Sequence, residues 1–246
     1  SDGCGRVGVI WRISWSGRAG WGFETPQCPS IPGSADGCKR GRRLHRAGRL
    51  NTLRLNFMHS ARAIAQPMTR NPMIDRLFSP DRAAPPVLLA PMAGVTDRPF
   101  RTMVRRFDVS ATVSEMIAGG TLVEGCRRTL SMIDLAGEPG PVAVQLAGRD
   151  PEVMAEAAEK AVEAGAAWID INMGCPAKKV TSGACGAALM REPDRAEAIV
   201  RAVIRAAGPV PVTVKMRLGW AEGELSAPDL AARLEQIGVA MITVHG

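Results

Sequence analysis

The 246-residue sequence lacks several common markers of function. Its six cysteines form no C-x-x-C pair, and none of its three histidines stands at metal-ligand spacing. Neither a zinc site nor a disulfide framework is therefore indicated. No apolar run approaches the roughly 18 residues that a membrane helix requires. These absences favour a cytoplasmic protein with reduced thiols, no membrane span and no bound metal.

Acidic residues are scarce in the first part of the chain. Residues 1–70 contain 12 Lys and Arg against 3 Asp and Glu, whereas residues 71–246 contain 19 against 21. The net charge of +7 is therefore entirely N-terminal, and it gives no support for nucleic-acid binding by the remainder. With 46% hydrophobic residues, the chain is long enough to bury one sizeable core.

Residues 1–67 also lack a sustained helical or strand period. They are rich in Gly, Arg, Trp and Ser, with few aliphatic residues around the tryptophans. An Arg-rich, acid-poor leader suggests a transit peptide, but the Gly and Trp content and the missing amphipathic period argue against it. We expect a disordered and dispensable leader, or non-native coding sequence before a start at Met58, Met68 or Met73.

After Pro86, short β-rich apolar runs alternate with helical patterns. The predicted strands are Val87–Ala90, Ala111–Ser114, Val142–Leu146, Trp168–Asn172, Val210–Lys215 and Met241–Val244. The predicted helices are Pro99–Arg106, Pro151–Ala164, Pro193–Ala207 and Pro228–Ile237. Proline in the first turn and glycine after the last turn mark several of these helices. A repeated strand–helix unit of about 30 residues implies a parallel sheet, either doubly wound or closed as a barrel.

Polar residues at the strand ends distinguish these two folds. The turn after the first strand, MAGVT at 92–96, lacks the G-x-G-x-x-G pattern of an open Rossmann sheet. Reactive or hydrogen-bonding residues instead end the later strands: Glu115, Gln145, Asn172, Lys215 and His245. Such groups over many strand ends are typical of a barrel. We therefore predict an α/β fold, an incomplete (β/α)8 TIM barrel with about six of its eight strands, over residues 68–246.

A Gly-Cys-Pro turn at 174–176 follows the fourth predicted strand and holds Cys175 above the barrel mouth, on a loop that proline stiffens. A cysteine in a turn is often only a small packed residue. Here it lies within a larger pattern, whose strings are APMAGVTDRPFR at 90–101, IDINMGCPAKKV at 169–180, VKMR at 214–217 and VHG at 244–246. In this order and spacing they resemble bacterial tRNA-dihydrouridine synthases, especially the B-type subgroup.

The resemblance implies an FMN oxidoreductase that reduces uridine to 5,6-dihydrouridine in tRNA and is re-reduced by NADPH. It implies FMN across the barrel mouth, a C-terminal helical tRNA-binding domain absent from this chain, and a monomer at full length. In this family's reaction hydride passes from N5 of reduced FMN to C6 of the uracil, while Cys175 would protonate C5. A thiol with a reference pKa near 8.5 keeps its proton at neutral pH and can still give it up.

The resemblance also assigns roles to strand-end residues. Asn172 would hydrogen-bond the uracil and Gln145 the pyrimidine edge of the flavin, because an amide offers both a donor and an acceptor. Lys215 would place a cation near the flavin N1–C2=O group, and His245 would donate to a flavin oxygen or phosphate. Arg217 would point toward RNA or the flavin tail.

Three residues of the first strand and its turn, Ala90, Pro91 and Met92, would pack against the flavin by the same resemblance. Lys178 would contact an RNA phosphate. With no tyrosine in the sequence, Trp220 is the only aromatic residue near a predicted strand end that could stack on a base. Each role has a structural alternative. Asn172 could cap the turn, His245 could be a core histidine and Lys178 could be a solvated charge. The residues at 90–92 could be ordinary packing.

Two other functions stay open at this point. A free-pyrimidine FMN enzyme of the dihydroorotate or dihydropyrimidine dehydrogenase type performs the same redox step in a similar barrel. The other is an inactive fragment that binds RNA and holds no flavin. The loop CPAKK at 175–179 fits the tRNA enzymes better than the first alternative.

Overall fold

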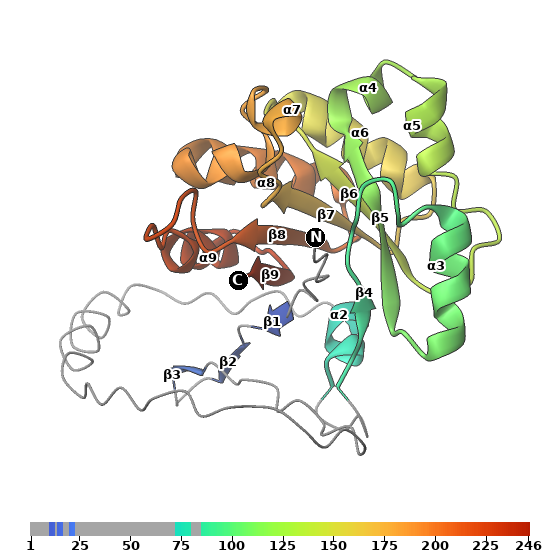
Figure 1. Cartoon of the computed structure of the whole chain (residues 1–246), viewed down its shortest axis with the longest axis horizontal. Coiled ribbons are helices and arrows are strands. Elements are labelled where there is room, and N and C mark those ends of the chain that lie inside the picture. Colours follow the sequence, from blue (N-terminus) through green and yellow to red (C-terminus); the bar gives the residue numbers. More distant parts are fainter. Residues whose placement is uncertain (1–9, 13, 17–19, 23–71, 80–84) are drawn as a thin grey trace, which may run out of the picture. The chain divides into compact units, whose positions relative to one another are not determined.

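The computed structural model describes residues 10–12, 14–16, 20–22, 72–79 and 85–246. Six parallel strands form its main sheet (Figure 1): β4 (Leu88–Leu89), β5 (Ala111–Ala118), β6 (Val142–Ala147), β7 (Trp168–Met173), β8 (Val212–Arg217) and β9 (Met241–His245). Each strand pairs in parallel with the next one along the chain. A doubly wound sheet reverses its strand order at a switch point, whereas this sheet does not. The prediction of a (β/α)8 barrel with six of its strands is thus confirmed.

All six predicted strands are present, but the second extends further than its sequence pattern indicates. Glu115 therefore lies inside β5 and not at its end, which corrects the prediction. The pairing of β5 with β6 shifts register between Val113 and Met116. Such a bulge adds a residue to one strand and interrupts the alternation of inward and outward side chains, so the pattern ended too early.

The helices include α3 (Arg98–Val104), continued by the 3-10 turn η1 (Arg105–Phe107), and α6 (Pro151–Glu163), α8 (Pro193–Ala207) and α9 (Ala227–Gln236). These confirm the four predicted helices. α6 is capped at its start, since the Asp150 carboxylate accepts hydrogen bonds from the N–H groups of Glu152 and Val153. Gly165, at φ +89°, follows the end of this helix in a conformation that favours glycine.

Five shorter elements were not predicted: α2 (Pro72–Leu77), α4 (Gly119–Val123), α5 (Arg127–Met132), α7 (Lys178–Thr181) and the 3-10 turn η2 (Gly186–Arg191). None is longer than six residues. A segment of fewer than two turns cannot display a 3.6-residue period, so no hydrophobic pattern predicted these elements. No helix in the part of the chain that the structure describes is long and apolar enough to span a membrane.

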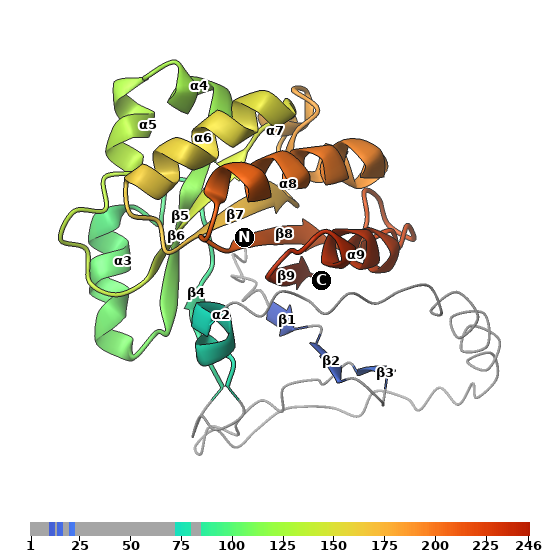
Figure 2. The same ribbon diagram turned by 180° about the vertical axis from the view of Figure 1, so that it is seen from behind.

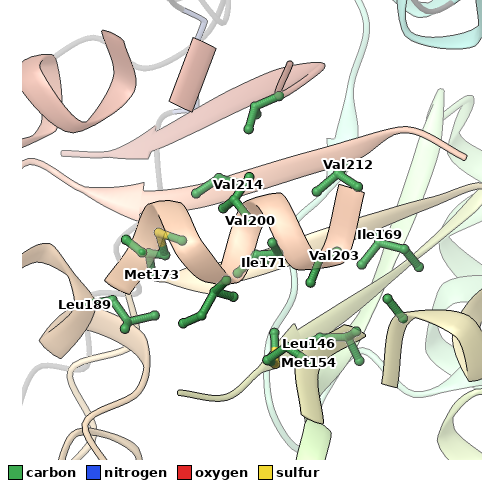
Figure 3. Close-up of a cluster of buried hydrophobic side chains, with 14 of the residues drawn as sticks. Leu146, Met154, Ile169, Ile171, Met173, Leu189, Val200, Val203, Val212 and Val214 are labelled. Carbon is green, nitrogen blue, oxygen red and sulfur yellow. The ribbon is translucent and has the colours of Figure 1, made fainter. Parts of the chain in front are cut away.

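The outward face of the sheet carries the main hydrophobic core. On β7, the alternate residues Ile169, Ile171 and Met173 are fully buried among side chains from α6 and α8, which lie side by side over the strands (Figures 2 and 3). Burying one such side chain contributes roughly 1.5 to 3 kcal/mol. Alternation then sends the intervening residues of the strand to the opposite face, toward the barrel axis.

A second cluster closes the amino-terminal ends of the inner strands. Ile74 and Leu77 of α2 pack there against Val113, Ala143 and Trp168, and the Trp168 side chain is fully buried. This helix therefore covers the bottom of the barrel interior. In barrel enzymes the active site lies at the opposite end, over the carboxyl ends of the strands.

Three short strands fall within the leader. β1 (Ile10–Arg12) pairs antiparallel with β9, and β2 (Ser14–Ser16) pairs with β3 (Gly20–Gly22). The sequence pattern predicted no strands there, because a three-residue segment is too short to show a hydrophobic period. Backbone hydrogen bonds between strands form without such a period. Most of residues 1–67 lie outside the described residues, and their proposed dispensability stays a prediction.

Candidate active site

Polar side chains gather toward the carboxyl ends of β6, β7 and β8, on the face of the sheet that points to the barrel axis. Parallel pairing sets Gln145 beside Asp170, and Asp170 beside Thr213. One row closer to the mouth, Asn172 pairs with Lys215. Regular alternation thus brings together residues that are up to 70 positions apart in the sequence.

Hydrogen bonds join these side chains into one continuous chain. The Thr213 hydroxyl donates to Asp170 Oδ1 at 2.5 Å, and Gln145 Nε2 donates to Asp170 Oδ2 at 2.7 Å. Asn172 Nδ2 donates to Gln145 Oε1 at 2.9 Å, and Asn172 Oδ1 accepts the backbone N–H of Cys175 at 2.9 Å. The orientation of each amide is therefore fixed by its neighbour, from the barrel interior to the turn that carries the thiol.

Asp170 and Lys215 are the charged groups of this layer. Burial raises the pKa of Asp170 against the opposing effects of the Thr213 and Gln145 hydrogen bonds and of Lys215. Burial also lowers the pKa of Lys215, although Asp170 and Cys175 favour its charged form. The site thus holds a desolvated cation beside a desolvated carboxyl group. Groups with such shifted pKa values cluster at the functional sites of proteins.

The turn that presents Cys175 is held from both sides. Asn172 Oδ1 also accepts the N–H of Gly174, at 3.2 Å, so it caps the turn through two backbone groups. The Cys175 carbonyl accepts the N–H of Ala187, at 3.0 Å, which ties the turn to η2. The side chain of Cys175 remains partly exposed. The thiol is therefore partly accessible on a turn that hydrogen bonds fix at both ends.

Gly186 permits this close return of the chain. It has φ +59°, and a Cβ at this position would lie 2.7 Å from the Cys175 carbonyl oxygen and 2.8 Å from Val180 Cγ1. Any other residue would push the Cys175 turn away from η2. This glycine carries no local sequence signal, because its partner lies 11 residues earlier.

Hydrogen bonds within the site limit how many further contacts Asn172 and Gln145 can make. Asn172 uses its oxygen for the turn and one N–H hydrogen for Gln145, so the turn-capping contact is present and one N–H hydrogen remains. Gln145 donates one N–H to Asp170 and keeps its second N–H hydrogen. Contacts of either residue with uracil or flavin stay predictions.

The other predicted residues lie around the mouth. Arg217 pairs with His245 across β8 and β9, on the same face as Lys215. Partial burial, together with the charges of Lys215 and Arg217, lowers the pKa of His245. Lys178 begins α7 and is exposed. These three residues therefore lie on the strand ends and the connection around the hydrogen-bonded chain.

The turn after β4 is fixed by residues that the sequence analysis gave no role. The buried Thr96 hydroxyl accepts the N–H of Met92 at 3.0 Å and donates to the Met92 carbonyl at 3.2 Å. A carboxylate oxygen of Glu115 accepts the N–H of Gly94. Among the three residues expected to contact flavin, Ala90 and Pro91 are half-buried, whereas Met92 is 40% exposed. The turn is therefore fixed by side-chain hydrogen bonds, and the Met92 side chain remains exposed on it.

A buried ion pair ties the same turn to the segment before β6. The Arg101 guanidinium forms two hydrogen bonds with the Glu138 carboxylate, at 2.7 and 2.6 Å, and donates to the Thr96 carbonyl at 2.7 Å. The two side chains are 3% and 0% exposed. Arg101 ends the first family string, so part of that string is structural and not catalytic.

Asp170 and Thr213 are the functional-site residues that sequence reasoning missed. A signal for Asp170 was present, because a carboxylate within an otherwise apolar buried strand needs a partner. Thr213 carried no such signal, since threonine is common in strands. Only the parallel register of β7 and β8 reveals that the two residues meet.

Comparisons with known proteins agree with this geometry. Residues 88–246 match the family described as dihydrouridine synthase. Over 166 residues the chain is 54% identical to a probable tRNA-dihydrouridine synthase of Rhodobacter capsulatus, covering 67% of this chain and 51% of the relative. It is 48% identical over 169 residues to tRNA-dihydrouridine synthase B of Xanthomonas campestris, covering 69% and 51%, and 46% identical over 160 residues to that of Pseudomonas aeruginosa, covering 65% and 48%.

The chain spans about half the length of these relatives. The match covers all six parallel strands, together with Cys175 and the hydrogen-bonded chain beneath it. The relatives from Xanthomonas and Pseudomonas carry the B designation, the subgroup that the sequence strings resemble. The chain therefore belongs to the bacterial dihydrouridine synthase family.

Proposed function

We propose that the full-length protein reduces uridine to 5,6-dihydrouridine in tRNA, with FMN as cofactor and NADPH as reductant. The observation that carries the proposal is the Cys175 thiol, partly exposed on a turn that Asn172 caps and Gly186 holds at the barrel mouth. Its relatives are named for this reaction. A reaction on tRNA also implies a cytoplasmic location.

The residues present at the mouth suit a flavin. Lys215 is a half-buried cation on the inward face, able to balance negative charge on the reduced ring near N1–C2=O. Gln145 keeps one N–H for the pyrimidine edge, and His245 stands at the rim for a flavin oxygen or phosphate. Ala90, Pro91 and Met92 would line the ring on the β4 side. When bound, reduced FMN would supply the hydride that adds to C6 of the uracil.

The protein's own residues would supply the proton and the orientation. Cys175 would donate its Sγ proton to C5 of the uracil and be left as a thiolate, with the nearby Lys215 cation stabilising that charge. The remaining N–H hydrogen of Asn172 would bind a uracil carbonyl. Arg217 and Lys178 would contact the RNA backbone. Because Asn172 binds both the Cys175 N–H and Gln145, substrate and acid would be positioned by one group.

The test separates the two half-reactions of the full-length enzyme. Proton delivery by a positioned acid contributes about 10² to 10⁴ in rate, so Cys175→Ala should lose tRNA turnover by that factor and keep near-normal FMN reduction by NADPH. Cys185→Ala, ten residues later in the same connection, is the matched control and should retain both half-reactions. Equal loss of both in Cys175→Ala would place this thiol in cofactor binding.

A substrate comparison completes the test. The enzyme should form dihydrouridine in unmodified tRNA and show little turnover of free uracil or dihydroorotate. Preference for a free pyrimidine would replace this proposal with the pyrimidine dehydrogenase function. An absorbance spectrum without a flavin band in the purified full-length protein would contradict the FMN assignment.

A further inference from the structure

A groove of about 630 Å³ lies beside the Cys175 turn. One wall is α7, with Lys178 and Thr181, together with Ser182 directly after it, and another is the end of η2, with Arg191. Trp220, from the connection that follows β8, contributes a third side. Two neighbouring connections at the carboxyl edge of the sheet thus form one hollow, where barrel enzymes bind their substrates.

The groove carries positive charge that no acid in the described residues neutralises. Lys178 and Arg191 form no ion pair in this part of the chain. The single acidic side chain in the lining, Glu192, is already paired with Arg149 at 3.4 Å and with Arg195 at 3.2 Å. Two cations without an acidic partner among the described residues, on a concave surface, favour an anionic ligand.

The same groove offers a flat aromatic surface. The Arg191 guanidinium lies over the Trp220 ring, 5.4 Å from its centre, and Trp220 is half-buried. A cation–π contact of this kind fixes both planes and keeps the guanidinium at the surface. Stacked aromatic and guanidinium planes are the surfaces on which proteins bind nucleic-acid bases.

Its position relates the groove to the proposed chemistry. α7 begins three residues after Cys175, and η2 holds the Cys175 carbonyl through Ala187 at 3.0 Å. Both walls are therefore part of the connection that presents the thiol. A ligand in the groove would lie next to the uridine to which Cys175 would donate its proton.

We propose that this groove binds a nucleotide that flanks the target uridine in the RNA strand. Lys178 and the Ser182 hydroxyl would take the phosphate, and the Arg191–Trp220 pair would stack on the base. The proposal rests on the function proposed above. A phosphate with an attached base also occurs in NADPH, so the experiment distinguishes RNA from the dinucleotide.

The experiment uses the full-length holoenzyme and unmodified tRNA. Removing one stacking surface costs about 1 to 3 kcal/mol per base, so Trp220→Ala should weaken tRNA binding roughly 5- to 150-fold, and Trp220→Phe should restore most of it. Lys178→Ala should lower the salt dependence of binding by about one counterion, whereas Arg191→Ala, which removes a stacking plane, should lower the affinity. Arg205→Ala, an exposed arginine on α8 outside the groove, is the matched charge control and should alter neither affinity nor slope.

Flavin content and KM for NADPH are measured for every variant, and both should stay at wild-type values. Wild-type tRNA affinity in Trp220→Ala and Arg191→Ala would overturn the proposal, as would an increased KM for NADPH with unchanged tRNA binding. If the wild type forms dihydrouridine while these variants bind normally, the groove assignment alone fails. If the wild type forms none, the proposed function itself fails.

Discussion

The inward face of the sheet has two ends that are built differently, and β7 contains both. At its start Trp168 is fully buried against apolar side chains, while Asp170 and Asn172, on the same face and 4% and 8% exposed, are held by hydrogen bonds. The lower end is stabilised by the burial of apolar side chains. A substitution there lowers the free energy of unfolding according to the apolar contacts that it removes. The upper end is stabilised only while every polar partner is present. The two ends should therefore respond to different substitutions.

The largest expected effect is at the packed end. Trp168→Ala removes a fully buried ring, and truncations of this kind cost about 3 to 5 kcal/mol. Denaturant unfolding of the purified protein measures the change in free energy. Trp168→Phe is the control and should lose much less, because the indole Nε1 has no hydrogen-bond partner in the described structure. A loss below about 1 kcal/mol for Trp168→Ala would contradict the packing role.

The next effect concerns the polar end. Thr213→Val keeps the shape of the side chain but leaves Asp170 Oδ1 without the hydroxyl that now donates at 2.5 Å. A buried acceptor left unsatisfied costs about 1 to 3 kcal/mol. Thr213→Ser retains the hydroxyl and should keep most of the stability in the same unfolding experiment. If valine and serine behave alike, the hydrogen bond contributes nothing.

A smaller effect should appear in the pH dependence of stability. Because burial raises the pKa of Asp170, the unfolded chain loses this proton first as pH rises above about 4. The folded state then binds more protons, so the contribution of this group to stability falls with increasing pH. Asp170→Asn can still accept from Gln145 and donate to Thr213, and it does not titrate. Thermal unfolding between pH 4 and 7 should show a smaller decline in the variant than in the wild type. Parallel curves would refute this.

The smallest effect is at the rim. Partial burial and the charges of Lys215 and Arg217 lower the pKa of His245, so its imidazole should titrate below the ordinary value of about 6.5. The histidine ring signals in an NMR titration measure this, with His245→Asn to assign the resonance. Lys215→Met removes one cationic neighbour and should move the pKa back upward. A midpoint above 6.5 in the wild type would contradict the described surroundings.

The packed end was more predictable from sequence than the polar end. All six strands were predicted because each contains a short apolar run, such as Trp168–Asn172, that can be recognised within the element itself. Gln145 and Asn172 were singled out because they lie at the ends of their predicted strands and the resemblance assigns them roles, and Asn172 also lies within the string at 169–180. Thr213 was not, because its importance depends on the register between β7 and β8, which no local pattern specifies.

Other missed features have the same origin. The bulge in β5 displaced Glu115 from the predicted strand end, and its contact with Gly94 spans 21 residues. The closeness of Gly186 to Cys175 depends on a positive φ and on a loop that returns to its start. A hydrophobic period describes how one element is buried, whereas these contacts depend on how separate elements meet.

The buried pair of Arg101 and Glu138 constrains how this sequence can change over generations. Replacing either partner alone leaves a desolvated charge and costs about 3 to 5 kcal/mol, a large share of the 5 to 15 kcal/mol that keeps a domain folded. Replacing both with apolar residues of similar volume is often nearly neutral. Single-step routes away from the pair therefore pass through poorly folded proteins. These two positions, 37 residues apart, should be inherited together, and lineages that lose one should have lost the other.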